Sequence, residues 1–478
     1  MILVDATIVS IATPAIMAAF GADVDVVVWV TSAYLLAYAV PLLITGRLGD
    51  RFGPRRCYLV GLTVFTLASL WCGLTGSITG LVIARVVQGL GAAILSPQTM
   101  SVITRTFPAD QRGRAMSLWG AVAGVAVLVG PILGGLLVDA LGWEWIFFVN
   151  VPVGVVGLVL AARLIPTLPT SVRRFDLLGV ALSAVGMFLL VFGIQEGQTF
   201  AWGAPAWGLI GAGLVVLVLF VVWQARGAAE PLVPMALFRD RNFSLANVAI
   251  TAVGFAVTAQ AFPITLYAQG VRGLSPTGAA LLLAPSAVIS TALSPYVGRL
   301  TDRAHPRWIA GIGLSCFAVS LLWLAAVMAP DTPIWALVLP ITLMGVGSGF
   351  MWAPISTSAT RNLPMSRAGA GAGVYNTTRQ VGAVLGSAGI AALMQSRLAA
   401  LLPGAGSAES AVQSLPPELH AGFSTAMAQA LVLPAVVMLV GLGAALAFAT
   451  PRHLLPPSDA AHDSAPATAV AEGGRGRT

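Results

Sequence analysis

The sequence predicts an all-α polytopic membrane protein with fourteen transmembrane helices. Of its 478 residues, 57% are apolar and only 9% are charged, which is too little polar surface for a soluble globule of this length. The apolar residues are gathered in runs, and short segments between these runs hold most of the arginines. A helix of about 20 residues crosses the roughly 30 Å of hydrocarbon in a bilayer, so each run is expected to form one span.

Hydropathy, with Gly, Pro and Arg taken as boundaries, places the spans along the chain. The first eight are expected at 1–20, 27–47, 57–76, 79–103, 115–138, 145–165, 177–195 and 206–225. Six more are expected at 244–268, 275–298, 308–329, 333–356, 369–395 and 423–449. The first run lacks the basic lead and the cleavage site of a signal peptide, so we expect it to be kept as a span.

The distribution of arginine predicts the orientation in the membrane. All 25 basic residues are Arg, and the formal net charge is +7. Arginines crowd the connections after the even-numbered spans, whereas the opposite side holds only Arg272 and Arg397 among several acids. Because basic loops stay in the cytoplasm, we expect a multi-pass protein of a bacterial inner membrane with both termini cytoplasmic. This placement explains the positive charge better than nucleic-acid binding does.

An internal repeat divides the chain. Gly46-Arg-Leu-Gly-Asp50-Arg51 recurs as Gly298-Arg-Leu-Thr-Asp302-Arg303, each time after the second span of a half. We therefore expect a six-helix half at 1–165, two inserted helices at 166–230, a second six-helix half at 231–450 and a disordered cytoplasmic tail at 451–478. Duplicated halves are typical of secondary transporters that alternate access, whereas a channel or receptor needs no such repeat.

Several motifs recur in an order typical of one family. They are the loop from Gly46 to Arg56, the segments Leu81–Ala93 and Gly130–Gly135, the first-span stretch Leu3-Val-Asp5-Ala-Thr7, the sixth-span stretch Trp143–Pro152, Phe238–Phe243 and Asn376–Gln380. Together they resemble the fourteen-span drug:proton antiporters of the major facilitator superfamily. The resemblance implies the major facilitator fold, with two six-helix halves and two inserted helices.

The resemblance also implies a function. We expect a secondary active transporter that exports hydrophobic small molecules, such as drugs or antibiotics, by proton-coupled antiport. The close alternative is a dedicated exporter of one endogenous metabolite, such as a self-made antibiotic, a siderophore or an amino-acid-like compound. An integral membrane enzyme is disfavoured, because no span offers paired acids, metal-spaced His or a nucleophile with a base. An ATP-driven pump is disfavoured because the sequence has no phosphate-binding GxxxxGK[ST] loop.

Three charged residues within the spans are candidates for proton coupling. Asp5 is the only acid placed inside a span, so it is the candidate proton carrier; the alternative is that it reaches the cytoplasmic surface. The resemblance gives Arg85 and Gln88 a part in proton transfer, although Arg85 is also suited to anchoring its helix. Helix rise places Arg85 too far outward to require contact with Asp5, which leaves carbonyls or Thr13 as partners. Arg379 falls near mid-membrane, with carbonyls, Asn376, Gln380 or Asp5 as possible partners.

Two glycine-containing motifs are candidates for the moving parts. The loop residues Gly46, Asp50, Arg51, Gly53 and Arg55 are expected to form a latch on the cytoplasmic side, in which Asp50 binds arginines or a helix N-terminus. The alternative is a solvated turn that only sets topology. In the fifth span, Gly130, Pro131, Gly134 and Gly135 form the antiporter motif and favour close helix approach, as static packing would also do.

Aromatic and polar residues within the spans are candidates for a substrate pocket, although aromatics in membrane helices more often pack. The candidates are Trp29, Tyr34, Tyr38, Phe262, Tyr267, Trp352, Tyr375 and Asn376. Cys57, Cys72 and Cys316 match no metal or redox spacing and are expected to pack. The expected partners are a small-molecule substrate, protons and the bilayer, with no nucleic acid, metal or cofactor, and a monomer is expected.

Overall fold

The computed structural model describes the chain except for residues 23, 171–175, 198, 228–229, 403–415 and 451–478. The predicted tail at 451–478 thus lies outside the described residues. Every regular element in the described part is a helix. This agrees with the requirement that a chain in lipid satisfies its backbone polar groups within each segment.

The helices up to residue 226 form the first part of the fold. They are α1 (Ile2–Phe20), α2 (Val24–Ala39), α3 (Leu42–Phe52), α4 (Pro54–Leu74), α5 (Ile78–Thr106), α6 (Arg112–Leu141), α7 (Trp145–Phe148), α8 (Asn150–Leu164), α9 (Leu177–Gln195) and α10 (Ala204–Arg226). The second part begins with the short helix η1 (Met235–Arg239). It continues with α11 (Arg241–Ala259), α12 (Ala261–Gly270), α13 (Pro276–Arg303), α14 (Pro306–Val327), α15 (Ile334–Thr360), η2 (Met365–Arg367), α16 (Ala368–Leu401), η3 (Pro417–Leu419), α18 (His420–Ala430) and α19 (Val432–Leu446).

Each predicted span falls on a helix or on two consecutive helices. Eleven helices of the described residues are long and apolar enough to cross a membrane, and the bent pair α2 and α3 makes twelve. The pair bends by 48° at Val40 and Pro41, where the proline lacks an amide donor for the helix. The fold is therefore an all-helical membrane fold, and the count of fourteen spans stays a prediction.

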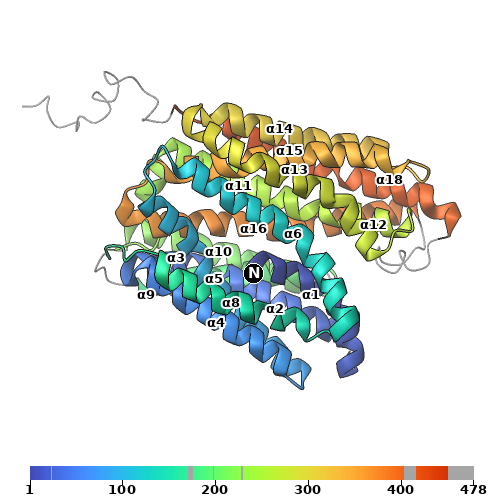
Figure 1. Ribbon diagram of the computed structural model, residues 1–478, viewed down its shortest axis with the longest axis horizontal. Coiled ribbons are helices and arrows are strands. Elements are labelled where there is room, and N and C mark those ends of the chain that lie inside the picture. The colour runs from blue at the N-terminus through green and yellow to red at the C-terminus, as the bar shows by residue number, and fades with distance from the viewer. Residues whose placement is uncertain (23, 171–175, 198, 228–229, 403–415, 451–478) are drawn as a thin grey trace, which may run out of the picture.

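The two halves lie in separate layers, with α6 and α16 running between them (Figure 1). Equivalent helices pack through equivalent glycines. An added Cβ on Gly91 of α5 would lie 2.6 Å from the Phe65 nitrogen of α4, and one on Gly347 of α15 would lie 2.6 Å from the Phe317 nitrogen of α14. Phe65 and Phe317 are 252 residues apart, as are Asp50 and Asp302. The sequence repeat is thus also a repeat of helix packing.

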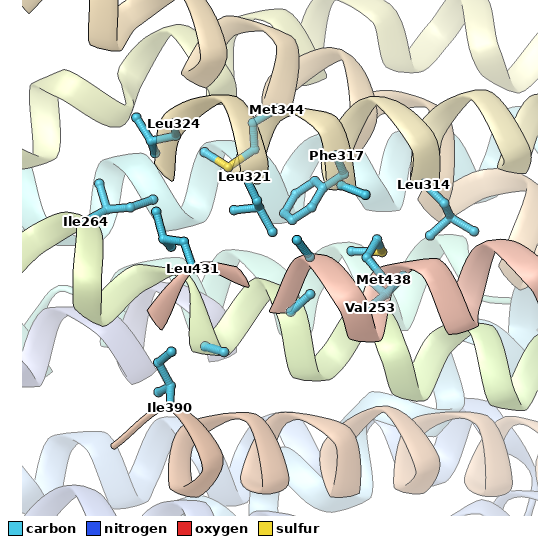
Figure 2. Close-up of a cluster of buried hydrophobic side chains, with 14 of the residues drawn as sticks. Val253, Ile264, Leu314, Phe317, Leu321, Leu324, Met344, Ile390, Leu431 and Met438 are labelled. Carbon is cyan, nitrogen blue, oxygen red and sulfur yellow. The ribbon is translucent and has the colours of Figure 1, made fainter. Parts of the chain in front are cut away.

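The interior of the second half is a cluster of aliphatic, methionine and aromatic side chains. In Figure 2, Leu314, Phe317 and Leu321 of α14 face Met438 of α19 and Leu431, which lies between α18 and α19. Lipid chains are as apolar as these side chains, so close packing rather than escape from water holds the helices together. This rigid body positions α16 at the interface between the halves.

The inserted helices α9 and α10 pack on each other and against one side of that interface. Met187, Leu190 and Val191 of α9 form a buried cluster with Leu36 of α2 and Val384 of α16. Asp176 is the N-cap of α9 and accepts a hydrogen bond from the Gly179 backbone. It also accepts hydrogen bonds from the side chains of Trp223 and Gln224 on α10. These contacts fix the inserted pair beside both halves.

Candidate functional site

A buried carboxylate lies in the first turn of α1. Asp5 is fully buried, and its Oδ2 lies 2.5 Å from Nη1 of Arg85, which is also fully buried. Its Oδ1 accepts hydrogen bonds from Gln88 Nε2 at 2.9 Å and from Asn150 Nδ2 at 3.0 Å. The alternative that Asp5 reaches the cytoplasmic surface is not met, because the side chain is buried and both oxygens are bound inside the first half.

The separation expected between Arg85 and Asp5 is wrong. Counting rise from the helix ends assumes upright helices with level ends and ignores the reach of an arginine side chain. Thr13 is not a partner of Arg85, since its hydroxyl donates to the Val9 carbonyl of its own helix. Close approach of α2 and α5 allows the Arg85 guanidinium to reach Asp5. A Cβ on Gly89, one turn after Arg85, would lie 2.5 Å from the Tyr34 carbonyl oxygen.

Arg85 has several partners besides Asp5. Its Nε donates to the Val30 carbonyl at 2.9 Å, and its Nη1 donates to Gln88 Oε1 at 2.7 Å. The guanidinium carbon lies 4.1 Å from the centre of the Tyr34 ring and 5.7 Å from that of Phe147, within range of cation–π attraction. The charge of Arg85 is thus held by neutral acceptors as well as by the carboxylate.

Two members of this network did not emerge from the sequence as site residues. Asn150 begins α8 and donates to both Asp5 and the Ser69 hydroxyl of α4, and Gln88 donates to Ser69 as well. Asn150 lies in the sixth-span motif, which was the available signal. Ser69 carries no signal, because a lone serine in an apolar helix is common. The network Asp5, Arg85, Gln88, Asn150 and Ser69 is called the acid network below.

Asp50, at the end of α3, binds the start of α16 in the other half. Its two oxygens accept hydrogen bonds from the backbone nitrogens of Gly369 at 2.9 Å and Ala370 at 3.0 Å. The positive end of a helix dipole favours a carboxylate at this position. Arg105 of α5 forms an ion pair with the same carboxylate, which is 1% exposed. The expected contacts of Asp50 with arginine and a helix N-terminus are therefore present.

The repeat of Asp50 makes the reciprocal contact. Asp302 of α13 accepts hydrogen bonds from the backbone nitrogens of Gly113 at 2.7 Å and Arg114 at 3.3 Å, in the first turn of α6. Arg361 lies 3.8 Å from its Oδ1, as Arg105 lies beside Asp50. Burial lowers the pKa of the Arg361 guanidinium to about 10, against the opposing effect of Asp302, so this side chain stays charged at neutral pH. Each half thus caps a helix of the other.

The remaining loop residues differ in what they touch. A Cβ on Gly46 would lie 2.5 Å from the Gly369 carbonyl oxygen, so this glycine permits contact between α3 and α16. Gly53 has a φ of 91°, which favours glycine at the turn into α4. Arg55 donates to the Ala162 carbonyl within its own half. Arg51 is exposed and lies over the Phe52 ring. Among the described contacts of these five residues, those of Gly46 and Asp50 reach the other half.

A further arginine, not predicted as a site residue, ties the halves together. Arg112 begins α6 and is 4% exposed. Its Nη2 donates to the Thr104 carbonyl of α5 at 2.7 Å, and its Nη1 donates to the Thr360 carbonyl of α15 at 2.8 Å. One guanidinium therefore binds the last turns of two equivalent helices.

The predicted antiporter motif lies in the C-terminal part of α6. Gly130 and Gly134 are buried, as close helix approach requires. A Cβ on Gly135 would meet no atom within 4 Å, so this glycine is not at a close contact among the described residues. The side chain of Pro131 lies outside the described set. The gating role of the motif remains a prediction.

Arg379 does not meet Asp5. Its Nη2 donates to the Tyr38 hydroxyl of α2 at 3.2 Å, and this hydroxyl is 3.0 Å from Ser96 Oγ of α5. The proposed partner Asn376 bonds instead to the Ala372 carbonyl of its own helix. Tyr38 in turn stacks on Tyr34 at 6.2 Å between ring centres. Aromatic rings thus connect Arg379 with Arg85.

A small cavity lies between the halves. Its lining residues are Thr99, Met100 and Ile103 of α5, Met116 and Trp119 of α6, Ser356 of α15 and Asn376 of α16. Trp352, a predicted pocket residue, packs edge-on against Trp119 at 6.4 Å. Of the predicted pocket residues, Asn376 lines this cavity and Trp352 supports its wall.

The other predicted pocket residues lie elsewhere. Tyr34 belongs to the surroundings of Arg85, and Trp29 lies beside Phe192 of the inserted helix α9. Tyr375 is buried in the core of the second half, and Tyr267 donates to the Ala329 carbonyl. Phe262 is 45% exposed. Composition alone does not distinguish aromatic residues that line an interface from those that pack or face lipid.

Comparison with known proteins agrees with this architecture. A family model described as Major Facilitator Superfamily matches residues 1–387. An uncharacterized MFS-type transporter of Mycobacterium tuberculosis is 55% identical over 93% of this chain and 78% of its own length. The tetracenomycin C resistance and export protein of Streptomyces glaucescens is 35% identical over 84% of this chain and 75% of its own length. A proton:xylose symporter has a similar fold, with a TM-score of 0.59 at 15% identity over 91% of this chain and 92% of that one.

Proposed function

Because this chain belongs to the Major Facilitator Superfamily, we propose that it is a proton-coupled antiporter that exports hydrophobic small molecules by alternating access. Its family and its relatives are transporters rather than enzymes. The export of drug-like compounds is suggested by the relative that exports tetracenomycin C. The proposal includes fourteen spans, a bacterial inner membrane and cytoplasmic termini, as the arginine pattern predicts.

The acid network is the observation that carries the proposal. Proton coupling needs a group whose charge changes during the cycle, and arginine stays protonated at accessible pH. Asp5 is a buried carboxylate with Arg85, Gln88 and Asn150 as donors. A proton arriving at Asp5 displaces one of these donors, which links protonation to a rearrangement of α1, α5 and α8.

Arg85 has other binding partners when Asp5 is neutral. The Val30 carbonyl, Gln88 Oε1 and the faces of Tyr34 and Phe147 already lie around it. A buried charge that loses its partner is otherwise costly, by about 3–5 kcal/mol. These neutral partners reduce that cost, so Arg85 remains bound when Asp5 takes up a proton. Val30 and Tyr34 lie on α2. A shift of Arg85 toward them is therefore passed along α2 to α3 and to the contact of α3 with α16.

The reciprocal capping of α16 by Asp50 and of α6 by Asp302 supports the alternating-access part of the proposal. Both contacts join the halves at the same end of the molecule, where the connecting segments are rich in arginine. When they are formed, the halves are held together on the proposed cytoplasmic side. Opening that side breaks both sets of charge-assisted bonds, and proton binding supplies the energy. One charge moved through 100 mV is worth about 2.3 kcal/mol.

The proposed function is tested by efflux in a pump-deficient bacterial host. Cells that make the protein are loaded with a panel of dyes and antibiotics, and retention is compared with and without a protonophore. We expect lower retention of several hydrophobic compounds, and collapse of the proton gradient should abolish the difference. Export that survives the protonophore would contradict proton coupling. Export of one endogenous metabolite alone would favour the dedicated exporter.

A further inference from the structure

Arg379, at the interface of the halves, has no acidic partner among the described residues. Arg379 lies eleven residues after Ala368, the first residue of α16, or about 16 Å along the helix. It is half-buried, and its hydrogen bond in the described structure goes to the neutral Tyr38 hydroxyl. Its Nε is buried with no hydrogen-bond partner, and no acid of the described residues forms an ion pair with it.

The buried aspartates of the described residues are each matched by an arginine, and the buried Arg112 is bound by backbone carbonyls at the ends of α5 and α15. Asp5 and Arg85 neutralise each other at 2.5 Å, with both side chains fully buried. Asp50 and Asp302 are each bound to an arginine and to two backbone nitrogens. Arg379 therefore leaves a positive charge without a carboxylate about 16 Å along α16, and an arginine placed within a span calls for a partner.

The cavity lies one helical turn from this charge on two helices. On α16, the cavity residue Asn376 is three residues before Arg379. On α5, the cavity residue Thr99 is three residues after Ser96, and the Ser96 hydroxyl is hydrogen-bonded to Tyr38 of α2. Residues at this spacing share a helix face. The cavity lining contains aromatic, methionine, hydroxyl and amide groups but no carboxylate. Trp119, which lines the cavity, packs edge-on against Trp352, and an aromatic ring at this place suits an apolar aromatic ligand.

We propose that this site selects substrates that combine an apolar aromatic body with an anionic group, a carboxylate or an ionised phenol. The anion binds the guanidinium of Arg379 beside Tyr38. The cavity has a volume of about 10 Å³ in this structure, so the aromatic body lies against Met100 and Trp119 once the halves move apart. The charge-assisted bond supplies a counter-ion, which no acid of the described residues does. A cationic substrate of the same shape is repelled by the same charge. This inference rests on the proposed function, because it names the class of molecule exported.

Three anthracene derivatives test this selection, because they share one aromatic ring system and differ in carrying a negative, a neutral or a positive group. Anthracene-9-carboxylate, 9-anthracenemethanol and 9-(aminomethyl)anthracene are titrated at neutral pH into the purified full-length protein in detergent, and binding is followed by anthracene fluorescence. We expect the carboxylate to bind at least about tenfold tighter than the alcohol, and the ammonium to bind weakest. Equal affinities, a preference for the ammonium or no binding of the carboxylate would overturn the inference.

Variants locate the selection at Arg379. Arg379→Gln should remove the advantage of the carboxylate over the alcohol, whereas Arg379→Lys should keep part of it. Arg397→Gln is the matched control, because it removes an exposed arginine from the same helix and should leave the order of affinities unchanged. An unchanged carboxylate preference in folded Arg379→Gln would refute the assignment, and the series on the unaltered protein stands even if that variant does not fold.

The two proposals fail separately. Tight carboxylate binding without gradient-driven efflux would refute proton-coupled export and leave the selectivity standing. Efflux of cationic dyes with no binding of the carboxylate would refute the selectivity and leave the exporter standing.

Discussion

Single residues show both what the sequence reveals and what it hides. Asp5 stood out because an acid within an apolar run is rare, and the structure buries it completely. Its contact with Arg85 was not predicted, because it depends on how α2 packs at Gly89 rather than on any local pattern. Asn150 was not predicted as a site residue for the same reason, because the sequence does not show that its amide donates to Asp5.

Replacing Asn150 tests the acid network without touching its charges. Asn150→Leu removes donors to Asp5 and Ser69, and a hydrogen bond to a charged group is worth about 1.5–3 kcal/mol. We expect gradient-driven export to fall at least about tenfold and thermal stability to drop. Asn362→Leu is the control, because it also removes a hydrogen bond from a side-chain amide to a carboxylate, that of Asp240. Both residues are far from the acid network in the sequence. Equal effects of the two variants would refute a special role for Asn150.

Whole helices were predicted better than their breaks. Every span placed by hydropathy falls on a helix or on two consecutive helices. Hydropathy did not indicate the bend between α2 and α3 or the break between α11 and α12, because a sum over side chains is insensitive to backbone direction. The loop motif indicated that Asp50 binds a helix N-terminus, and only the structure identifies α16 as that helix. The repeat at Asp302 acquires its partner, α6, in the same way.

Neutral variants of the two aspartates test the cytoplasmic contacts. Asp50→Asn and Asp302→Asn each keep an acceptor but lose the charge, which is worth about 1–2 kcal/mol at a partly buried helix N-terminus. We expect each to shift the halves toward the open cytoplasmic side about fivefold or more, and to impair export with normal membrane insertion. The readout is the alkylation rate of Asn376→Cys in a background whose native cysteines are replaced. Unchanged alkylation and export would show that the loops only set topology.

Close helix contact at the same place predicts a steric effect. Gly46→Leu should force α3 away from α16, because even a Cβ there would lie 2.5 Å from a backbone oxygen. We expect export to be lost and alkylation of Asn376→Cys to increase. Gly135→Leu is the matched control, since its Cβ position is open within 4 Å. Normal export by Gly46→Leu would contradict the close contact.

At the scale of the whole molecule, the sequence indicated duplication and orientation. The repeat of Gly46–Arg51 at Gly298–Arg303 corresponds to a structural equivalence, because both aspartates accept hydrogen bonds from first-turn backbone nitrogens of a helix in the opposite half. The shared cavity was not predictable, since its lining comes from α5, α6, α15 and α16 of both halves. Contacts between distant segments are the information that one sequence lacks.

A topology reporter tests the fourteen-span arrangement. The connection between the last two predicted spans should face outward, although Gly404 within it lies outside the described residues. A reporter that is active only outside the cytoplasm, fused after Gly404, should be active, and one fused after Ala449 should be inactive. Cytoplasmic placement of the first fusion would refute the count of fourteen.

Proton coupling through Asp5 is the central claim, and an exchange assay in proteoliposomes tests it most directly. Purified protein is reconstituted with an exported substrate, a pH gradient is imposed, and uphill substrate movement and proton flux are recorded together. Asp5→Asn, which resembles a permanently protonated site, should bind substrate yet show neither uphill movement nor coupled proton flux, and Asp5→Glu should keep part of both. Full gradient-driven export by Asp5→Asn would contradict the account and move the proton site to Asp139 or Glu196 at the outer helix ends.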